Sequence, residues 1–212
     1  NANLSNANLS NANLYKANMP RVNLSMANLY KADIFDADLS SANLSSANLS
    51  SADLYAVDLS NADLSNADLS NAVMTEAVMT EANLSNAYMS GANLDNANLT
   101  NANLTNANLT DTGLFYADLI DANMTGVNLT SARMYHANLT GANLTSVIMS
   151  NANLTSANMT SAIMSNANLT SANLTNANLT LMNVISNGIY LADANLLNAN
   201  MSSANLSSAN MT

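Results

Sequence analysis

Residues 1–15 read NANLS-NANLS-NANLY, and this unit of five residues continues in one unbroken frame through residue 190. Each copy has an apolar centre, which is Leu4 in the first copy, and all 38 centres are Leu, Met, Ile or Val. The residue two places before the centre is Ala or Val in 35 copies, and the residue just before it is Asn or Asp in 30. A repeat that spans the chain decides the fold, because each copy must adopt the same local structure.

The five-residue period fits neither an α-helix nor a flat β-strand. A helix turns by about 100° per residue, so a period of five would spread the apolar residues around its whole circumference. A strand alternates between its two faces, and the apolar spacings of two and three residues break that alternation. We therefore expect each unit to form one short side of a coil. Ala and Leu would point inward, Asn would point outward, and the next two polar residues would turn the corner.

This pattern resembles the pentapeptide-repeat family, whose motif is A-(D/N)-L-x-x. The resemblance covers essentially the whole chain, and it implies an all-β fold. The implied structure is a right-handed quadrilateral parallel β-helix, a solenoid with four units in each coil and therefore about 20 residues per coil. At ~4.8 Å per coil, residues 1–212 would form a rod roughly 50 Å long.

Composition bounds the functional classes. Charged residues make up 8% of the chain, hydrophobic residues make up 49%, and the formal net charge is −10. Disordered acidic chains have the opposite balance, so we expect the chain to fold. The absence of Cys excludes disulfides, thiolate metal ligands and Cys nucleophiles. The sequence contains no apolar run of the ~20 residues that a membrane helix needs, and its four Lys and Arg residues argue against direct nucleic-acid binding.

The frame is broken once, and we expect a single domain over residues 1–212. Ile189 is taken as the last centre of the first frame, and the next clear centre is Leu196, seven residues later. We therefore predict a two-residue bulge or small loop near residues 190–194. A tolerated insertion at the edge of a solenoid is favoured over a binding loop.

Both ends of the sequence lie inside repeat units, at Asn1 and at Thr212. An open solenoid end exposes unpaired backbone groups, which can pair with another coil. We therefore expect the chain to be a segment of a longer repeat protein or to stack end to end with other copies.

One column of the predicted coil gathers aromatic side chains. Positions 20 residues apart should stack, which places five aromatic residues in one column, interrupted by Thr75 and Asp95: Tyr15, Phe35, Tyr55, Phe115 and Tyr135. Two interpretations stay open. Aromatic neighbours stabilise adjacent strands, and an exposed row of aromatic rings is also typical of a surface that contacts a partner.

Acidic residues gather beside that column. Nine of the 14 acids fall between residues 33 and 81, and Asp33 should stack under Asp53 as Asp38 does under Asp58. Stacked like charges oppose folding, so a role in partner contact is one interpretation. The favoured one is that Asp simply replaces Asn in the motif. The candidate partner-contact face therefore comprises the five aromatic residues and these four acids.

The sequence indicates no catalytic, cofactor or metal site. His136 is the only histidine, and it has no carboxylate cluster at a ligand spacing. The sequence also contains no nucleophile elbow, phosphate loop or dinucleotide motif. By contrast, 21 units contain Asn-(Leu/Met)-(Ser/Thr), the N-glycosylation acceptor pattern, which the motif generates automatically. We expect sparse glycans on Asn if the protein is secreted.

These observations favour a non-catalytic structural or scaffold rod, acting in an extended assembly or a longer repeat protein, with protein partners or itself as partner. An alternative is a protein-binding module such as an acidic DNA mimic that inhibits a type II topoisomerase, a role that some members of the resembled family have. A third is a surface protein that contacts ice or carbohydrate. We expect no membrane insertion. The compartment stays open, with an extracellular or surface location favoured over the cytoplasm.

Overall fold

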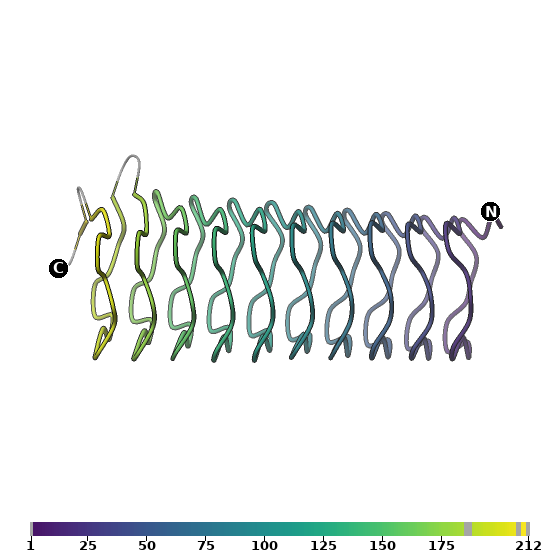
Figure 1. The fold of residues 1–212 in the computed structure, drawn as a ribbon. Coiled ribbons are helices and arrows are strands. Elements are labelled where there is room, and N and C mark those ends of the chain that lie inside the picture. Colours follow the sequence, from purple (N-terminus) through teal and green to yellow (C-terminus); the bar gives the residue numbers. More distant parts are fainter. Residues whose placement is uncertain (1, 185–187, 207–208, 211–212) are drawn as a thin grey trace.

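The computed structural model describes residues 2–184, 188–206 and 209–210. These residues form a right-handed, four-sided parallel β-helix, drawn in Figure 1 as a stack of coils along one axis. Among the described residues there is no helix and no strand longer than one residue; each coil meets the next through single-residue parallel bridges. The bridges join residues 20 apart from Asn3↔Asn23 to Ile163↔Asn183, as the predicted coil length requires.

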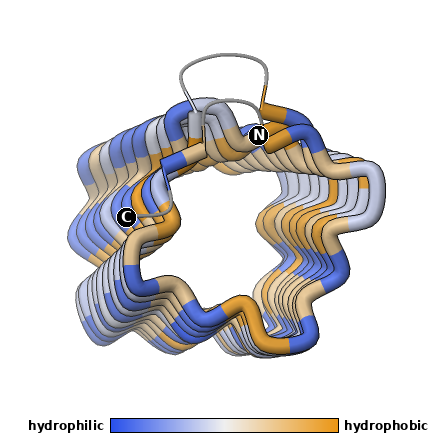
Figure 2. Tube along the Cα trace, turned by 90° about the vertical axis from the view of Figure 1, so that its left-hand side faces the viewer, coloured by the Kyte–Doolittle hydropathy of each residue, from blue (hydrophilic) through white to orange (hydrophobic). Residues whose placement is uncertain are grey.

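The four sides of the rod can be named by their bridge residues. Face 1 carries Asn3 and every twentieth residue to Asn183, and faces 2, 3 and 4 begin at Asn8, Asn13 and Asn18. Viewed along the rod, the coils lie directly behind one another (Figure 2). Since the units succeed one another in the order of the faces, each corner of the rod carries two adjacent columns, and the residues within a column are 20 apart.

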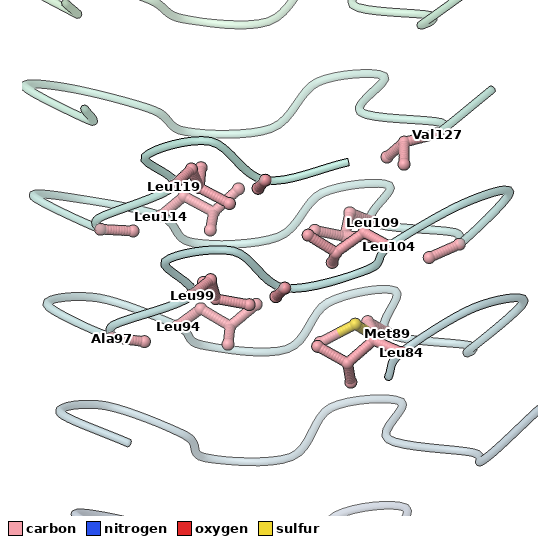
Figure 3. Close-up of a cluster of buried hydrophobic side chains, with 14 of the residues drawn as sticks. Leu84, Met89, Leu94, Ala97, Leu99, Leu104, Leu109, Leu114, Leu119 and Val127 are labelled. Carbon is pink, nitrogen blue, oxygen red and sulfur yellow. The ribbon is translucent and has the colours of Figure 1, made fainter. Parts of the chain in front are cut away.

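The interior contains the two apolar residues of every unit, as predicted. Between Val22 and Leu191 the centres and the small residues before them are at most 6% exposed. Centres from neighbouring coils pack on one another in the interior, as Leu84, Leu104 and their neighbours do in Figure 3. Burial of one Leu or Met side chain contributes about 1.5–3 kcal/mol. In the first and last described coils the same residues are only partly buried, because a coil covers them on one side only.

From the first unit to Leu181, each unit closes with a turn that the motif letters do not reveal. The N–H of Ala7 donates to the carbonyl of Leu4 at 3.0 Å, and Asn6, the third residue of this turn, has a φ of 59°. A single positive φ at that place is the mark of a type II turn. The same left-handed conformation recurs at every fifth residue from Asn6 to Leu181.

This turn explains why the two corner residues of a unit differ in kind. Thr occurs at the first corner position, as at Thr100, but never at the second corner position between Asn6 and Leu181, where Val and Ile are also absent. β-branched residues are strongly disfavoured at positive φ, whereas Asn, Asp and Gly tolerate it. The second corner position is accordingly filled mainly by Asn, Ser, Asp and Gly.

The Asn or Asp before each centre has a structural role of its own. Its Oδ1 accepts the N–H of the first corner residue, as Asn158 does from Thr160 at 3.2 Å, and it also accepts the Thr160 hydroxyl at 2.7 Å. Its Nδ2 can reach the previous coil, where Asn158 donates to Thr140 Oγ1 at 2.8 Å. Asp can accept these bonds but cannot donate to the coil below.

The position of the frame break corrects the sequence analysis. The bridges stay 20 apart through Ile163↔Asn183 and become 22 apart at Asn168↔Tyr190, so the two extra residues precede Tyr190 rather than following it. Ile189 fills the place of the small inward residue, Tyr190 is the outward bridge residue, and Leu191 is the centre. The predicted bulge near 190–194 is therefore wrong in position, and the chain is regular again there. Residues 185–187 lie outside the described residues.

Candidate functional site

The most distinctive part of the surface is the corner between faces 3 and 4. It consists of two adjacent columns, which begin at Tyr15 and Lys16 and recur every 20 residues to Thr175 and Asn176. We call it the aromatic edge. It carries six of the nine aromatic residues of the chain: Tyr15, Phe35, Tyr55, Phe115, Tyr116 and Tyr135.

The first three aromatic residues of the edge in sequence order form a continuous stack. The ring centroids of Tyr15 and Phe35 are 5.4 Å apart and those of Phe35 and Tyr55 are 4.9 Å apart, with interplanar angles of 26° and 11°. The predicted column is therefore confirmed at these positions. The rings remain accessible, with 51% of Tyr15 exposed. Such contacts contribute about 0.2–1 kcal/mol each, so the stack stabilises the coils and still presents an apolar surface.

Charged groups run along the second column beside the rings. The Lys16 ammonium lies 5.2 Å from the centroid of the Tyr15 ring and 3.5 Å from Asp36 Oδ2, one coil further on. The hydrogen bond with Tyr15 and the nearby Asp36 raise the pKa of Lys16. Three coils further along the column of Lys16, the side chain of Glu76 hydrogen-bonds with Tyr55 and raises the pKa of that phenol.

The four predicted acids flank the stack, two on each adjoining face. Asp33 and Asp53 form one bridge pair on face 3, and Asp38 and Asp58 form another on face 4. Each carboxylate accepts the N–H two residues later, at 2.9–3.2 Å. The Ser40 hydroxyl and its N–H lower the pKa of Asp38. These acids thus perform the local task of the motif Asn, while their charge remains on the surface beside the rings.

A second aromatic cluster lies further along the same edge. Phe115 meets Tyr135 edge to face at 6.3 Å, in the predicted column. Tyr116 and His136, in the neighbouring column, stack at 4.7 Å with an interplanar angle of 7°, and Phe115 packs edge-on against Tyr116 at 4.3 Å. The cluster therefore holds four rings, of which the sequence-based candidate face contained only two.

An irregular unit, Asp111–Phe115, supports this cluster. Gly113 replaces the usual Asn, so the N–H of Phe115 lacks its normal acceptor and donates to Asp95 Oδ1, one coil earlier, at 2.9 Å. A Cβ on Gly113 would lie 2.9 Å from that same oxygen, which explains the glycine. Thr112 replaces the inward Ala, and its buried hydroxyl donates to the Met89 carbonyl at 3.1 Å. Asp95 thus supplies the acceptor that Gly113 lacks, and a comparison of each unit with the motif alone could not detect this contact between two coils.

The described part of the chain contains no group of three or more His, Cys, Asp or Glu side chains that could hold a metal ion. Over the same residues no helix is long and apolar enough to span a membrane. The edge therefore offers aromatic rings, the carboxylates of Asp36 and Glu76, and the Lys16 ammonium.

Comparison with known proteins agrees with the geometry. A family model described as pentapeptide repeats matches residues 1–40, 32–75, 77–114, 114–145, 148–181 and 187–212. A search of curated proteins gives no significant match.

Solved structures share the architecture. HetL, a pentapeptide repeat protein involved in heterocyst differentiation regulation in the cyanobacterium Nostoc, is 33% identical, with a TM-score of 0.66 over 97% of this chain and 90% of HetL. QnrB1, a plasmid-mediated fluoroquinolone resistance protein, is 14% identical, with a TM-score of 0.51 over 90% of this chain and 86% of its own. The second likeness concerns the fold alone.

Proposed function

The chain belongs to the pentapeptide-repeat family, and from this premise we propose that it is a non-catalytic scaffold rod that binds a protein partner along its aromatic edge. The rod would act within an extended assembly, either as part of a longer solenoid or as copies stacked end to end. One observation carries the proposal. Two clusters of partly exposed aromatic rings occupy a single corner of a rod whose other surfaces are mainly Asn, Ser and Thr.

Exposed aromatic residues in rows are unusual on polar surfaces and are enriched in protein interfaces. A rigid solenoid holds such residues at fixed spacings, so little conformational entropy is lost when a partner binds. Several potential catalytic groups of the described residues are engaged in contacts within the rod. Ser and Thr hydroxyls such as that of Thr160 donate to the neighbouring Asn, and His136 stacks on Tyr116. These engagements support a non-catalytic role.

The two alternative functions receive less support from the same observations. A mimic of DNA needs negative charge along the whole rod, but nine of the 14 acids lie between Asp33 and Glu81. In the coils after Glu81, the outward position before the centre is mostly Asn. An ice- or carbohydrate-contacting face needs free hydroxyl groups in a flat array. Thr140, Thr160 and Thr180 instead donate to Asn within their own units, at 2.6–2.7 Å.

Photo-crosslinking would test the contact edge. Benzoylphenylalanine replaces Phe35 or Phe115 on the edge, and Ser45 or Thr125 in the matched controls, within the cells that produce the protein. The control positions follow the edge positions by ten residues, half a coil, and therefore occupy the opposite corner at the same height. We expect one protein partner to be captured from both edge positions and not from the controls. Equal capture from both corners would contradict the proposal.

Electron microscopy of native material would test the extended assembly. Each coil offers the next the same backbone groups, as Leu24 N donates to Asn43 O at 2.7 Å and Asn43 N to Val22 O at 2.9 Å, so a further coil could extend the stack. We expect rods longer than the roughly 50 Å that 212 residues supply at ~4.8 Å per coil. Uniform single rods of that length in native material would contradict this part of the proposal.

A further inference from the structure

We propose that the aromatic edge binds a lysine side chain of its partner at the level of Tyr55, between the ring of Tyr55 and the carboxylate of Glu76. This inference rests on the proposed function, because it names the chemistry of the partner that the edge would contact. The argument comes from a comparison of two equivalent places on the rod, two coils apart, of which one already holds a lysine of this chain.

The first place shows how the edge holds an ammonium group. Lys16 follows Tyr15 at the corner, and its Nζ lies over the Tyr15 ring and 3.5 Å from Asp36, one coil further on. A ring face and a carboxylate together attract a cation, through the ring quadrupole and through direct charge pairing. The raised pKa of Lys16 agrees with this stabilisation of its charged form.

A shift of 40 residues, two coils, brings the same kinds of groups together without the cation, and at this place the Glu76 side chain hydrogen-bonds with Tyr55. Tyr15 corresponds to Tyr55 and Asp36 to Glu76, whereas Lys16 corresponds to Ala56. The backbone is the same at both places, with φ of 54° at Lys16 and 52° at Ala56. Ala56 is the one alanine at the second corner position between Asn6 and Leu181. A small residue there leaves room for a lysine from another molecule beside the ring and the Glu76 carboxylate, which hydrogen-bonds with Tyr55 and keeps further acceptor sites.

The surroundings of Tyr55 favour a cation more strongly than those of Tyr15. Asp53 and Asp58 lie on the two faces beside Tyr55, where the Tyr15 level has Asn13 and Asn18. One coil further on, Val73 and Val78 stand above these two acids and are 41% and 36% exposed. A lysine stem can pack along such aliphatic side chains while its ammonium group reaches the carboxylates. We therefore assign the partner as a protein segment that carries lysine next to apolar residues.

Binding of a fluorescent hexalysine peptide, measured by anisotropy near physiological salt, tests the assignment. Glu76→Gln should weaken binding about fivefold, because it removes the acid that pairs with the ammonium beside a partly exposed ring. Glu81→Gln is the matched control. It removes the same charge at the same turn position, with φ of 59° against 61° for Glu76, but on the next corner of the rod. We expect Glu81→Gln to change binding by less than about twofold, as expected for a screened charge outside the site.

A second pair of variants fills the site from within the chain. Ala56→Lys should place an ammonium group between Tyr55 and Glu76, as Lys16 does between Tyr15 and Asp36, and should weaken hexalysine binding at least about fivefold. Ser46→Lys adds the same charge at the same turn position on another corner and should have a clearly smaller effect.

Equal effects within either pair would show that hexalysine responds to net charge only, and would overturn the lysine site. The contact edge itself is tested separately, by the crosslinks from positions 35 and 115. If the protein alone self-associates in light scattering, and Glu76→Gln abolishes this association, the site belongs to a lysine of a second copy. That result would overturn the assignment to a different partner.

Discussion

Replacing Leu104 by Asp is expected to unfold the central coils of the rod, at a cost of about 4 kcal/mol or more, because it buries a carboxylate that has no partner. Leu104 is fully buried, and it packs in the interior with Leu84 of the previous coil and Leu109 of the next unit in its own coil (Figure 3). The stability of a solenoid is approximately a sum over neighbouring coils, so damage at one coil weakens the stacking on both sides. Chemical denaturation followed by circular dichroism would measure the loss.

Two controls separate the buried charge from the mere change of residue. Leu104→Met keeps an apolar centre like the native Met89 and Met124, and should cost less than about 1.5 kcal/mol. Asn103→Ser changes the outward neighbour and should cost about 1 kcal/mol, since it removes the bond from Asn103 Nδ2 to Asn83 at 3.2 Å. Equal destabilisation by Leu104→Asp and Asn103→Ser would refute the inward and outward assignments.

The period of five residues and the family resemblance together predicted the coil and which residues of each unit point inward. An apolar pair at a spacing of two, repeated every five residues, predicts that each unit forms one side of a coil, and the resemblance to the pentapeptide-repeat family implied that the coil has four sides. The stack of Tyr15, Phe35 and Tyr55 followed from the coil length, because residues 20 apart must then be neighbours. The stacks and the burial of the centres confirm both predictions.

The failures of prediction arose where two arrangements satisfied the same pattern. Near the frame break Ile189 and Leu191 are both apolar and two residues apart, so either could be the centre. In the structure Leu191 is the centre, and Ile189 occupies the inward position that is usually Ala. Sequence periodicity records only that a residue is apolar, not which of two adjacent frames forms the better backbone pairing with the coil below.

Contacts between units were also beyond the sequence pattern. Asp95 at a corner and Gly113 on the next coil each depart from the motif, and only their contact shows that one compensates for the other. The match between Tyr15–Lys16–Asp36 and Tyr55–Ala56–Glu76 likewise depends on the contacts of Lys16. The sequence alone could have drawn attention to this place, because Ala56 departs from the Asn, Ser, Asp or Gly that is usual at the second corner position.

Inserting one extra NANLT unit between Ser90 and Gly91 is expected to leave the rod folded but to separate the two aromatic clusters by a quarter turn. Every unit supplies the same inward pair, so an added unit keeps the core continuous. All residues from Gly91 onward, however, move to the next face, and Phe115 leaves the corner that carries Tyr55. A partner that contacts both clusters should then lose crosslinking from position 115 at least about tenfold, because the geometry forbids simultaneous engagement.

Inserting four NANLT units at the same place is the decisive comparison. Four units complete one coil, so Phe115 returns to the aromatic edge and lies only about 4.8 Å further from Tyr55. The four-unit variant carries the larger insertion, and yet it should retain crosslinking within about twofold, since both clusters again face the same partner. Thermal unfolding would show that both variants fold. If the one-unit and four-unit insertions reduce crosslinking alike, or if neither does, binding does not depend on both clusters lying on the same corner. The two clusters are then not parts of one contact surface.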